Sequence, residues 1–311
     1  MKQFIFTGPG TLRLDRFILQ QVPALAPGAL HKYLRENKIK LNGKKAPLNT
    51  RLQPGDEVRL YLPTPSEGAA PAAPPFPRNW ILYEDDELLA LYKPPGLISQ
   101  GGTPGTDSLL ARARTHLAAN GGAASSTFAP VLCHRLDTGT SGVILVAKTA
   151  RMEEYTTGLL RRRQLVKTYL GLAVGQLAPP AGELHGWLLK NEARAEVQVL
   201  PHKAPGAKAA HTSYETLAVS GRLSLLRLCP HTGRTHQLRA QLAAAGTPLL
   251  GDSKYGQNAI NRALRCRYQC LCALELRFPE TDDAAFAPYS GLCIACPPPW
   301  FYHQALAGTL R

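Results

Sequence analysis

One stretch of the sequence combines residue types that acid–base or nucleophilic chemistry requires. It reads His134, Arg135, Leu136 and Asp137, followed by Thr-Gly-Thr-Ser-Gly. An aspartate before Thr-Gly is most often a turn residue whose side chain bonds the backbone two residues further on. This loop, however, lies between the apolar runs VLC and VILVA, which favour strands. A carboxylate near a sheet is partly desolvated and requires a cationic partner, so Asp137 is a candidate for chemistry.

The stretch HRLDTGTSGVILVAK, residues 134–148, resembles the signature of the RluA-type pseudouridine synthases. Three further segments resemble the same family in the same order: LYKPPGLISQ, VKTYLGLAVG and HTGRTHQLRAQLAAAGTPLLGDSKYG. The resemblance spans about residues 80–256. It implies that the protein isomerises uridine to pseudouridine in RNA. In that reaction the bond between ribose and the uracil nitrogen breaks, the base turns, and it rejoins the sugar through carbon.

The resemblance implies catalytic roles for three residues. Asp137 corresponds to the family's catalytic carboxylate, acting either as a nucleophile or as the base for a sugar proton, and both roles need an ionised carboxylate. Arg239, in the HQLR segment, corresponds to the arginine that pairs with this carboxylate; an exposed helix arginine is the alternative. Tyr169 corresponds to the KxY tyrosine, which packs beside the target base and helps to move a proton. A buried structural tyrosine is the alternative.

The neighbours of these residues are expected to hold the target nucleotide. Arg135 is expected to assist base flipping, because a stacked uracil cannot reach a pocket. Leu238 is expected to form a wall of the pocket, and His134 to contact the substrate. Arg234 and His236 are expected either to contact phosphate or to order the loop at the start of a helix.

The positive charge of the chain is concentrated near its beginning. The 311 residues include 36 Lys and Arg against 22 Asp and Glu, a formal net charge of +14. Residues 1–62 contain eleven of the basic residues and four of the acidic ones, about half of the excess. Clustered cations can displace counterions from a phosphate backbone, whereas a solvated basic surface needs no clustering. The charge therefore favours a polyanionic partner.

The same segment resembles the alpha-L RNA-binding motif, the ribosomal S-four type domain, through LRLDRFILQQ, LHKYLRENKIKLNGKKA and LQPGDEVRL. In that family a helix pair and the following hairpin bind structured RNA. Helical spacing over 12–22, a second helix over 28–37 and a tight turn at Asn42-Gly43 fit this interpretation. The cations expected to contact RNA are Arg13, Arg16, Lys32, Arg35, Lys38, Lys40 and Lys44.

Three regions are expected along the chain: an RNA-binding domain over 1–62, a Pro- and Ala-rich linker over 63–79, and a catalytic domain over 80–311. In the catalytic domain, runs of predicted strands outnumber the helices. This pattern predicts an α+β fold, with a bent, mostly antiparallel or mixed sheet flanked by helices and loops.

Several other classes are disfavoured. No apolar run approaches the roughly 18 residues of a membrane span, and the start MKQFIFTGPG lacks the apolar stretch of a secretion signal. Seven cysteines without an export signal indicate reduced thiols in the cytoplasm. CIAC has zinc-site spacing, but it lies in an apolar segment, as does CLCALELRF; buried thiols in strands are favoured and no metal is expected. No Gly-rich loop precedes Lys-Ser/Thr, so no nucleotide is expected. The isomerisation that the resemblance implies involves no net redox change or hydrolysis, so no other cofactor is expected.

The sequence therefore predicts a monomeric RNA pseudouridine synthase whose partner is structured RNA. Family association favours large-subunit ribosomal RNA, while transfer RNA remains open because the motifs are the same. A non-catalytic RNA-binding or ribosome-assembly protein could lose Asp137, Tyr169 and Arg239, yet all three are present. A glycosidase would normally require two working carboxylates, and the loop contains one.

Overall fold

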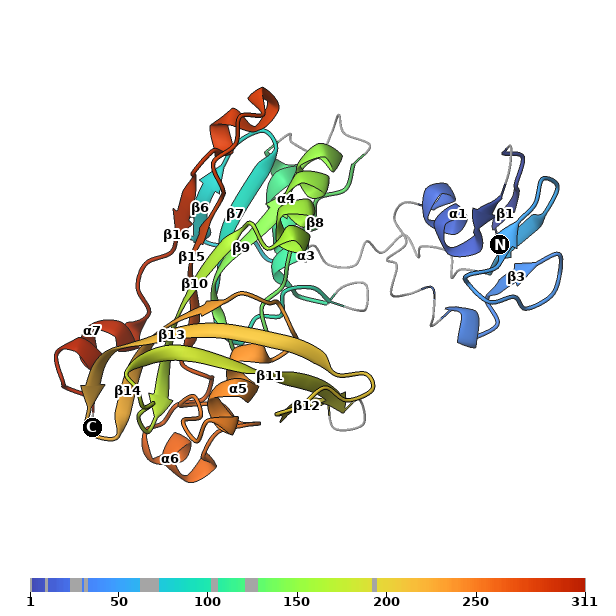
Figure 1. The fold of residues 1–311 in the computed structure, drawn as a ribbon. Helices are drawn as coiled ribbons and strands as arrows, with labels where there is room; N and C mark the ends of the chain where they lie inside the picture. Colours follow the sequence, from blue (N-terminus) through green and yellow to red (C-terminus); the bar gives the residue numbers. More distant parts are fainter. Residues whose placement is uncertain are drawn as a thin grey trace. The chain divides into compact units, whose positions relative to one another are not determined.

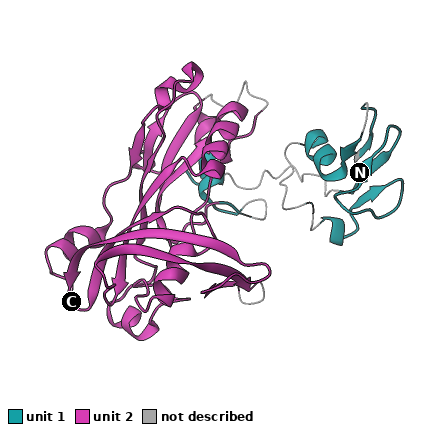
Figure 2. Cartoon of the chain, in the orientation of Figure 1, with its two compact units in different colours: residues 1–75, 100–115 teal, residues 76–99, 116–311 magenta. Residues whose placement is uncertain are grey.

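The computed structural model describes residues 2–8, 11–22, 30, 33–61, 73–101, 106–120, 128–191 and 195–310. The chain divides into two compact units (Figure 2). Unit 1 comprises residues 1–75 and 100–115, and unit 2 comprises residues 76–99 and 116–311. Lys32 and most of the expected linker lie outside the described residues. The boundaries placed at residues 62 and 79 stay a prediction.

The described residues of unit 1 form two small antiparallel sheets and helix α1, and they include residues 109–115 of helix α3 (Leu109–Ala119). The order of the larger sheet is β1-β5-β3, and the smaller one pairs β2 with β4. Helix α1 follows β2 directly. Their bounds are β1 (Lys2–Ile5), β2 (Leu12–Arg13), α1 (Leu14–Gln21), β3 (Ile39–Leu41), β4 (Arg51–Leu52) and β5 (Glu57–Leu60).

The expected periodicities of unit 1 are present. Leu14, Phe17 and Ile18 all face the core from α1, as helical spacing predicts. Asn42 and Gly43 have φ angles of 49° and 77°, the left-handed values that the predicted tight turn requires. Of the predicted second helix over 28–37, residues 30 and 33–35 are helical among those described.

Unit 2 is built on one eleven-stranded sheet, in the order β12-β11-β13-β14-β10-β15-β9-β7-β6, with β16 beside β15 and β8 beside β9 (Figure 1). The β9–β15 pair is parallel and the others are antiparallel, so the predicted mixed, mostly antiparallel α+β fold is confirmed. The strands are β6 (Ile81–Glu84), β7 (Leu88–Lys93), β8 (Val131–Leu132), β9 (Ser141–Ala147), β10 (Val166–Val174), β11 (Ala181–Asn191), β12 (Glu196–Leu200), β13 (Lys208–Ser220), β14 (Leu223–Pro230), β15 (Leu271–Arg277) and β16 (Cys293–Ala295).

The sheet bends along its length. In Figure 1, β11 and β13 run across the direction of β7 and β9. A register shift between Thr168 and Tyr169 interrupts the β10–β15 ladder, and irregularities of this kind bend a strand and increase its twist. The bend therefore falls next to a residue that the sequence nominates for catalysis.

Strands β9 and β15 approach each other unusually closely at Gly142. This residue has a φ of 119°, and a Cβ at its position would collide with the backbone of Ala273. Glycine is consequently required where the Asp137 loop enters β9.

Helices cover parts of this sheet. Helix α4 contacts β9, α5 contacts β11, β12 and β14, and α7 contacts β13 and β14. None of the described helices has the length and apolar character that crossing a membrane requires. The bounds are η1 (Arg78–Trp80), α3 (Leu109–Ala119), α4 (Ala150–Arg162), α5 (Gln237–Ala244), α6 (Asn258–Ala263), η2 (Ala284–Tyr289) and α7 (Trp300–Leu306).

All seven cysteines are free thiols, and their burial differs from the prediction at one position. Cys270, Cys272 and Cys296 are buried, as expected; Cys272 lies within β15, while Cys270 directly precedes β15 and Cys296 directly follows β16. Cys293 is exposed, because alternate residues of β16 point to opposite faces and its side lies toward solvent. The prediction of a buried thiol was wrong there.

Candidate active site

The Asp137 loop, residues 134–140, connects β8 to β9 and is held from below by buried side chains. Ser99 Oγ donates to the carbonyl of Leu136 at 2.7 Å and accepts from its N–H at 3.1 Å. The fully buried Lys93 donates to the carbonyl of Thr138 at 3.1 Å and to two carbonyls of its own turn. These bonds fix the backbone from which Asp137 projects.

Lys93 was not nominated from the sequence. Burial lowers its pKa to about 7, against an opposing contribution from the charge of Asp137. Its three carbonyl acceptors match the three donors of an ammonium group, which favours the charged form. A cation is therefore buried beneath the Asp137 loop.

Asp137 lies in a turn, since the N–H of Thr140 donates to its carbonyl at 3.0 Å. Its carboxylate nevertheless faces across to α5, where Arg239 Nη1 donates to Oδ2 at 2.9 Å. The Arg239 side chain is 9% exposed and that of Asp137 is 21% exposed. The ion pair expected from the sequence is thus present. The turn is closed by the backbone carbonyl of Asp137, not by the side-chain bond that the turn-residue interpretation expected.

A second aspartate orients Arg239. Asp252 accepts from Arg239 Nε at 2.7 Å and from Nη2 at 2.9 Å, a two-point pairing that leaves Nη1 for Asp137. Burial alone would raise the pKa of Asp252, but the hydrogen bonds and charge of Arg239 hold it below its usual range. The N–H groups of Lys254 and Tyr255 also donate to this carboxylate. Arg239 is thereby fixed as a charged donor aimed at Asp137.

His236 approaches the same carboxylate from the start of α5. Tyr255 Oη accepts from the N–H of Val197 at 2.7 Å, so its own proton is available for His236 Nδ1 at 2.9 Å. This network assigns the ring proton to Nε2, which lies 3.9 Å from Asp137 Oδ2. Burial lowers the pKa of His236, which favours this neutral form.

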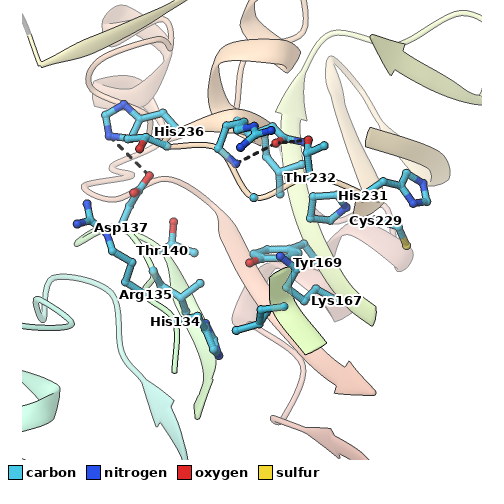
Figure 3. A pocket seen from close by; sticks show the side chains of 18 of the residues that line it. His134, Arg135, Asp137, Thr140, Lys167, Tyr169, Cys229, His231, Thr232 and His236 are labelled. Carbon is cyan, nitrogen blue, oxygen red and sulfur yellow. Dashed lines mark hydrogen bonds and ion pairs between the residues drawn. The ribbon is translucent and has the colours of Figure 1, made fainter. Parts of the chain in front are cut away.

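Tyr169 and Lys167 face Asp137 from the bend of the sheet. Figure 3 shows them on the opposite side of the cavity from Asp137 and His236. Burial and the charge of Asp137 raise the pKa of Tyr169, so the phenol keeps its proton. Burial lowers the pKa of Lys167, which lies on the same side of β10.

All eight residues nominated around the Asp137 loop line one cavity of about 940 Å³. Leu238 is buried in its wall, Arg135 is exposed, and Arg234 Nε donates to the carbonyl of Ala209 at 3.1 Å. His134 Nε2 accepts from the N–H of Leu145 at 3.2 Å, and burial lowers its pKa to about 3. The eight are Arg135, His134, Asp137, Tyr169, Arg234, His236, Leu238 and Arg239.

The cavity is strongly cationic. Among the described residues that line it, Asp137 is the one acidic side chain. Exposed arginines at the end of α4 widen the positive surface. The basic members of the lining are Arg135, Arg161, Arg163, Lys167, Arg234 and Arg239. A single carboxylate surrounded by cations suits an anionic polymer, and the lining offers no carboxylate pair for a metal.

Sequence reasoning missed three residues that position the site: Lys93, Asp252 and Gln237. Gln237 is buried; its Oε1 accepts from Thr232 Oγ1 at 2.7 Å and its Nε2 donates to the carbonyl of His211 at 3.0 Å. It thereby anchors the loop before α5. All three lie inside the segments that carry the family resemblance, which was the available signal.

Comparison with known proteins gives a consistent result. The profile of the RNA pseudouridylate synthase family matches residues 87–244, half of the chain. Ribosomal large subunit pseudouridine synthase C of Rickettsia conorii is 30% identical over 264 residues, covering 81% of this chain and 84% of the relative. The protein of the same name from Escherichia coli strain K12 is 30% identical over 258 residues, covering 81% and 78%.

Two solved structures are also similar. Human RNA pseudouridylate synthase domain containing 4 has a TM-score of 0.58 and 27% identity, covering 74% of this chain and 92% of its own. Human RNA pseudouridylate synthase domain containing 1 has a TM-score of 0.56 and 25% identity, covering 73% and 86%. The residues that the family profile matches, 87–244, include every described residue that lines the cavity except Leu271.

Proposed function

The chain belongs to the RNA pseudouridylate synthase family, and from that premise we propose that it isomerises uridines of large-subunit ribosomal RNA, with Asp137 as the catalytic carboxylate. The observation that carries the assignment of Asp137 is its 2.9 Å hydrogen bond from the buried Arg239, inside a cavity where it is the one acid among the described lining residues. The relatives named for the ribosomal large subunit support the substrate class.

Asp137 meets the demands of both mechanisms open to it. Attack on the sugar carbon and removal of a sugar proton each require an ionised carboxylate within reach of the ribose. Arg239 supplies a fixed positive charge and a hydrogen bond to one oxygen, and the other oxygen receives none of the hydrogen bonds found among the described residues. Oδ1 is the atom we propose acts on the sugar.

Tyr169 is proposed to contact the detached base. Its protonated phenol forms the wall opposite Asp137, where a uracil ring would lie between the two side chains. Turning the base requires a surface that holds the ring without trapping it, and an aromatic face can do this. Leu238 would complete the apolar part of the pocket.

The basic lining is proposed to hold the RNA strand around the flipped uridine. Extruding a base costs a few kcal/mol, which contacts to the flanking phosphates must offset. Arg135 adjoins Asp137 in sequence and is exposed, so it suits the space that the base vacates. Arg161 and Arg163, exposed at the end of α4, suit phosphates.

A glycosidase acting on free sugars fits the geometry less well. The second nearby carboxylate, Asp252, is fully buried and both of its oxygens accept from Arg239. It therefore cannot act as a second working acid or base.

For unit 1 we propose an S-four type RNA-binding function. Arg16, Arg35 and Lys44 are exposed cations, whereas Lys38 and Lys40 are half-buried beside the tyrosine rings of Tyr33 and Tyr61. Arg13 pairs with Asp15 at the surface. Such exposed cations can be recruited by phosphate at little cost. We further propose that one copy acts alone in the cytoplasm, since all eight nominated residues of the cavity come from one chain.

The test follows tritium released from carbon 5 of labelled uridine in three RNAs: a large-subunit ribosomal fragment, a transfer RNA and an unrelated hairpin. We expect release from the ribosomal fragment by the wild type and none by Asp137→Asn, which keeps the shape of the side chain and removes its charge. Asp282→Asn, at an exposed position, is the matched control and should behave as the wild type.

Each outcome separates the alternatives. Tritium release by Asp137→Asn would refute Asp137 as the catalytic carboxylate. Release from transfer RNA alone would show that transfer RNA, and not ribosomal RNA, is the substrate. Binding of RNA without release from any of them would favour a non-catalytic RNA-binding protein.

A further inference from the structure

Three histidine rings stack in a row on one face of the sheet in unit 2. His185 on β11 and His211 on β13 are direct cross-strand partners, with ring centroids 4.3 Å apart and planes 14° apart. His231, just after β14, continues the row at 4.3 Å from His211. None of the three imidazole rings is assigned a role in the reaction proposed above, although His231 also lines the Asp137 cavity. Each ring is carried by or adjoins a paired strand, so their spacing is set by the sheet.

A carboxylate completes the cluster. Glu183 lies two residues before His185 on β11 and therefore on the same face. Its Oε2 is 2.9 Å from His185 Nε2 and 3.2 Å from His211 Nε2. The candidate ligand atoms of these three residues all lie within 4.8 Å of one another.

The spacing matches a metal coordination sphere. Imidazole and carboxylate ligands bind Zn²⁺ at about 2.0–2.2 Å, so neighbouring ligands of a tetrahedral ion lie roughly 3.4 Å apart. The observed distances of 2.9 and 3.2 Å from the carboxylate to the two nitrogens lie near this spacing, and the two stacked rings would have to turn about their side-chain bonds so that both nitrogens point at one ion. Two nitrogens and one oxygen are a ligand set that Zn²⁺ accepts.

His211 provides an independent sign of a missing partner. Its Nε2 is buried and, among the described residues, has no hydrogen-bond partner, although Glu183 lies within ion-pair distance. A buried polar atom without a hydrogen-bond partner destabilises the fold unless something satisfies it. A metal ion between His211, His185 and Glu183 would do so.

We propose that Glu183, His185 and His211 form a binding site for Zn²⁺, with the remaining coordination positions open to solvent. The backbone of His211 also anchors the loop before α5: its N–H donates to Thr232 Oγ1 at 3.0 Å, and its carbonyl accepts from Gln237 Nε2 at 3.0 Å. A metal ion here would join β11 to the strand that supports this loop. The site is independent of the proposed reaction.

The test is a titration of the chelator-treated full-length protein with Zn²⁺ alone, against a chromophoric competing chelator. We expect the wild type to bind one equivalent of Zn²⁺ per chain, with saturation. His185→Ala and His211→Ala should each weaken the affinity by more than about tenfold, the loss that removing even an outer-sphere partner can produce. His202→Ala, at an exposed position, is the matched control and should bind as the wild type. Because His185 is exposed, its variant tests the site even if His211→Ala fails to fold.

Substitution with Co²⁺ identifies the ligand type. A site of histidine and carboxylate gives no thiolate charge-transfer band, whereas binding at the cysteines of the C-terminal region does. Three results would each overturn the proposal. They are a thiolate band, one equivalent of metal still bound by the double variant His185→Ala/His211→Ala, and the absence of saturable binding. Loss of RNA affinity in His185→Ala without any metal stoichiometry would instead identify the rings as a stacking surface.

Discussion

Two arginine–aspartate pairs in this chain share their chemistry and differ in setting. In unit 1, Arg13 donates to Asp15 at 2.6 Å with an arginine side chain that is 52% exposed. In unit 2, Arg239 donates to Asp137 at 2.9 Å and is 9% exposed. Water and salt screen the first pair, whereas the second is fixed in a region where an unpaired charge is costly. Exposed cations remain available to a mobile partner, and a buried one can hold a catalytic group in place.

The largest expected difference is in the loss of stability when the aspartates that pair with the two arginines are replaced. Asp252→Asn removes the charge paired with buried Arg239, and we expect the unfolding free energy of unit 2 to fall by about 3 kcal/mol. Urea unfolding followed by tryptophan fluorescence measures this, because Trp80, Trp187 and Trp300 all belong to unit 2. Turnover should fall as well, since Arg239 loses the partner that orients it.

The matched change in unit 1 is Asp15→Asn. We expect the unfolding free energy, followed by circular dichroism, to change by less than about 1 kcal/mol. Equal losses in the two variants would show that burial does not distinguish the pairs.

A buried histidine, His134, is expected to make the stability of unit 2 depend on pH. The unfolded His134 ring binds a proton below about pH 6.5, while the folded ring stays neutral down to about pH 3 because it is buried. The unfolded state therefore binds more protons in this window, and stability falls as the pH is lowered. Between pH 6.5 and 5 this group should remove about 2 kcal/mol, at about 1.4 kcal/mol per unit.

His134→Asn should reduce that pH dependence of unfolding, whereas His202→Asn, at an exposed position, should leave it unchanged. Urea midpoints at the two pH values measure both variants. A slope that is the same in wild type and His134→Asn would argue against a buried neutral ring.

The smallest effect on the folded chain is expected from the exposed cations of unit 1. Replacing Arg16, Arg35 and Lys44 with glutamine should leave turnover at saturating RNA unchanged. The slope of log affinity against log salt should become shallower by about 1 for each RNA phosphate that the variant no longer neutralises. Filter binding over a range of salt concentrations measures this. An unchanged slope would mean that these cations do not touch RNA.

The main elements of unit 2 could be predicted because their patterns are local. VILVA forms the buried strand β9, the run THQLRAQLAAAG contains helix α5, and Gly246 has the left-handed φ of 79° expected after a helix. The family resemblance nominated Asp137, Tyr169 and Arg239, which the structure brings to one cavity. Their roles stay proposals until the variants are measured.

What the sequence did not reveal depends on contacts between distant segments. Asp252 is a polar residue between Gly and Ser, and its complete burial becomes visible only when Arg239 lies against it. Lys93 lies in a turn-forming stretch, yet the fold places it under Thr138. The pairing of His185 with His211 follows from the register of β11 and β13, which no local pattern specifies.

Strand β15 has a consequence for synthesis. It lies between β9 and β10 and is the link that joins the two halves of the described sheet, although it comes after both in the chain. A ribosome making this protein must translate through Leu271–Arg277 before the wall carrying Tyr169 can be joined to the one carrying Asp137. The nascent chain therefore cannot bring Asp137 and Tyr169 together in the finished sheet until Leu271–Arg277 has emerged from the ribosome.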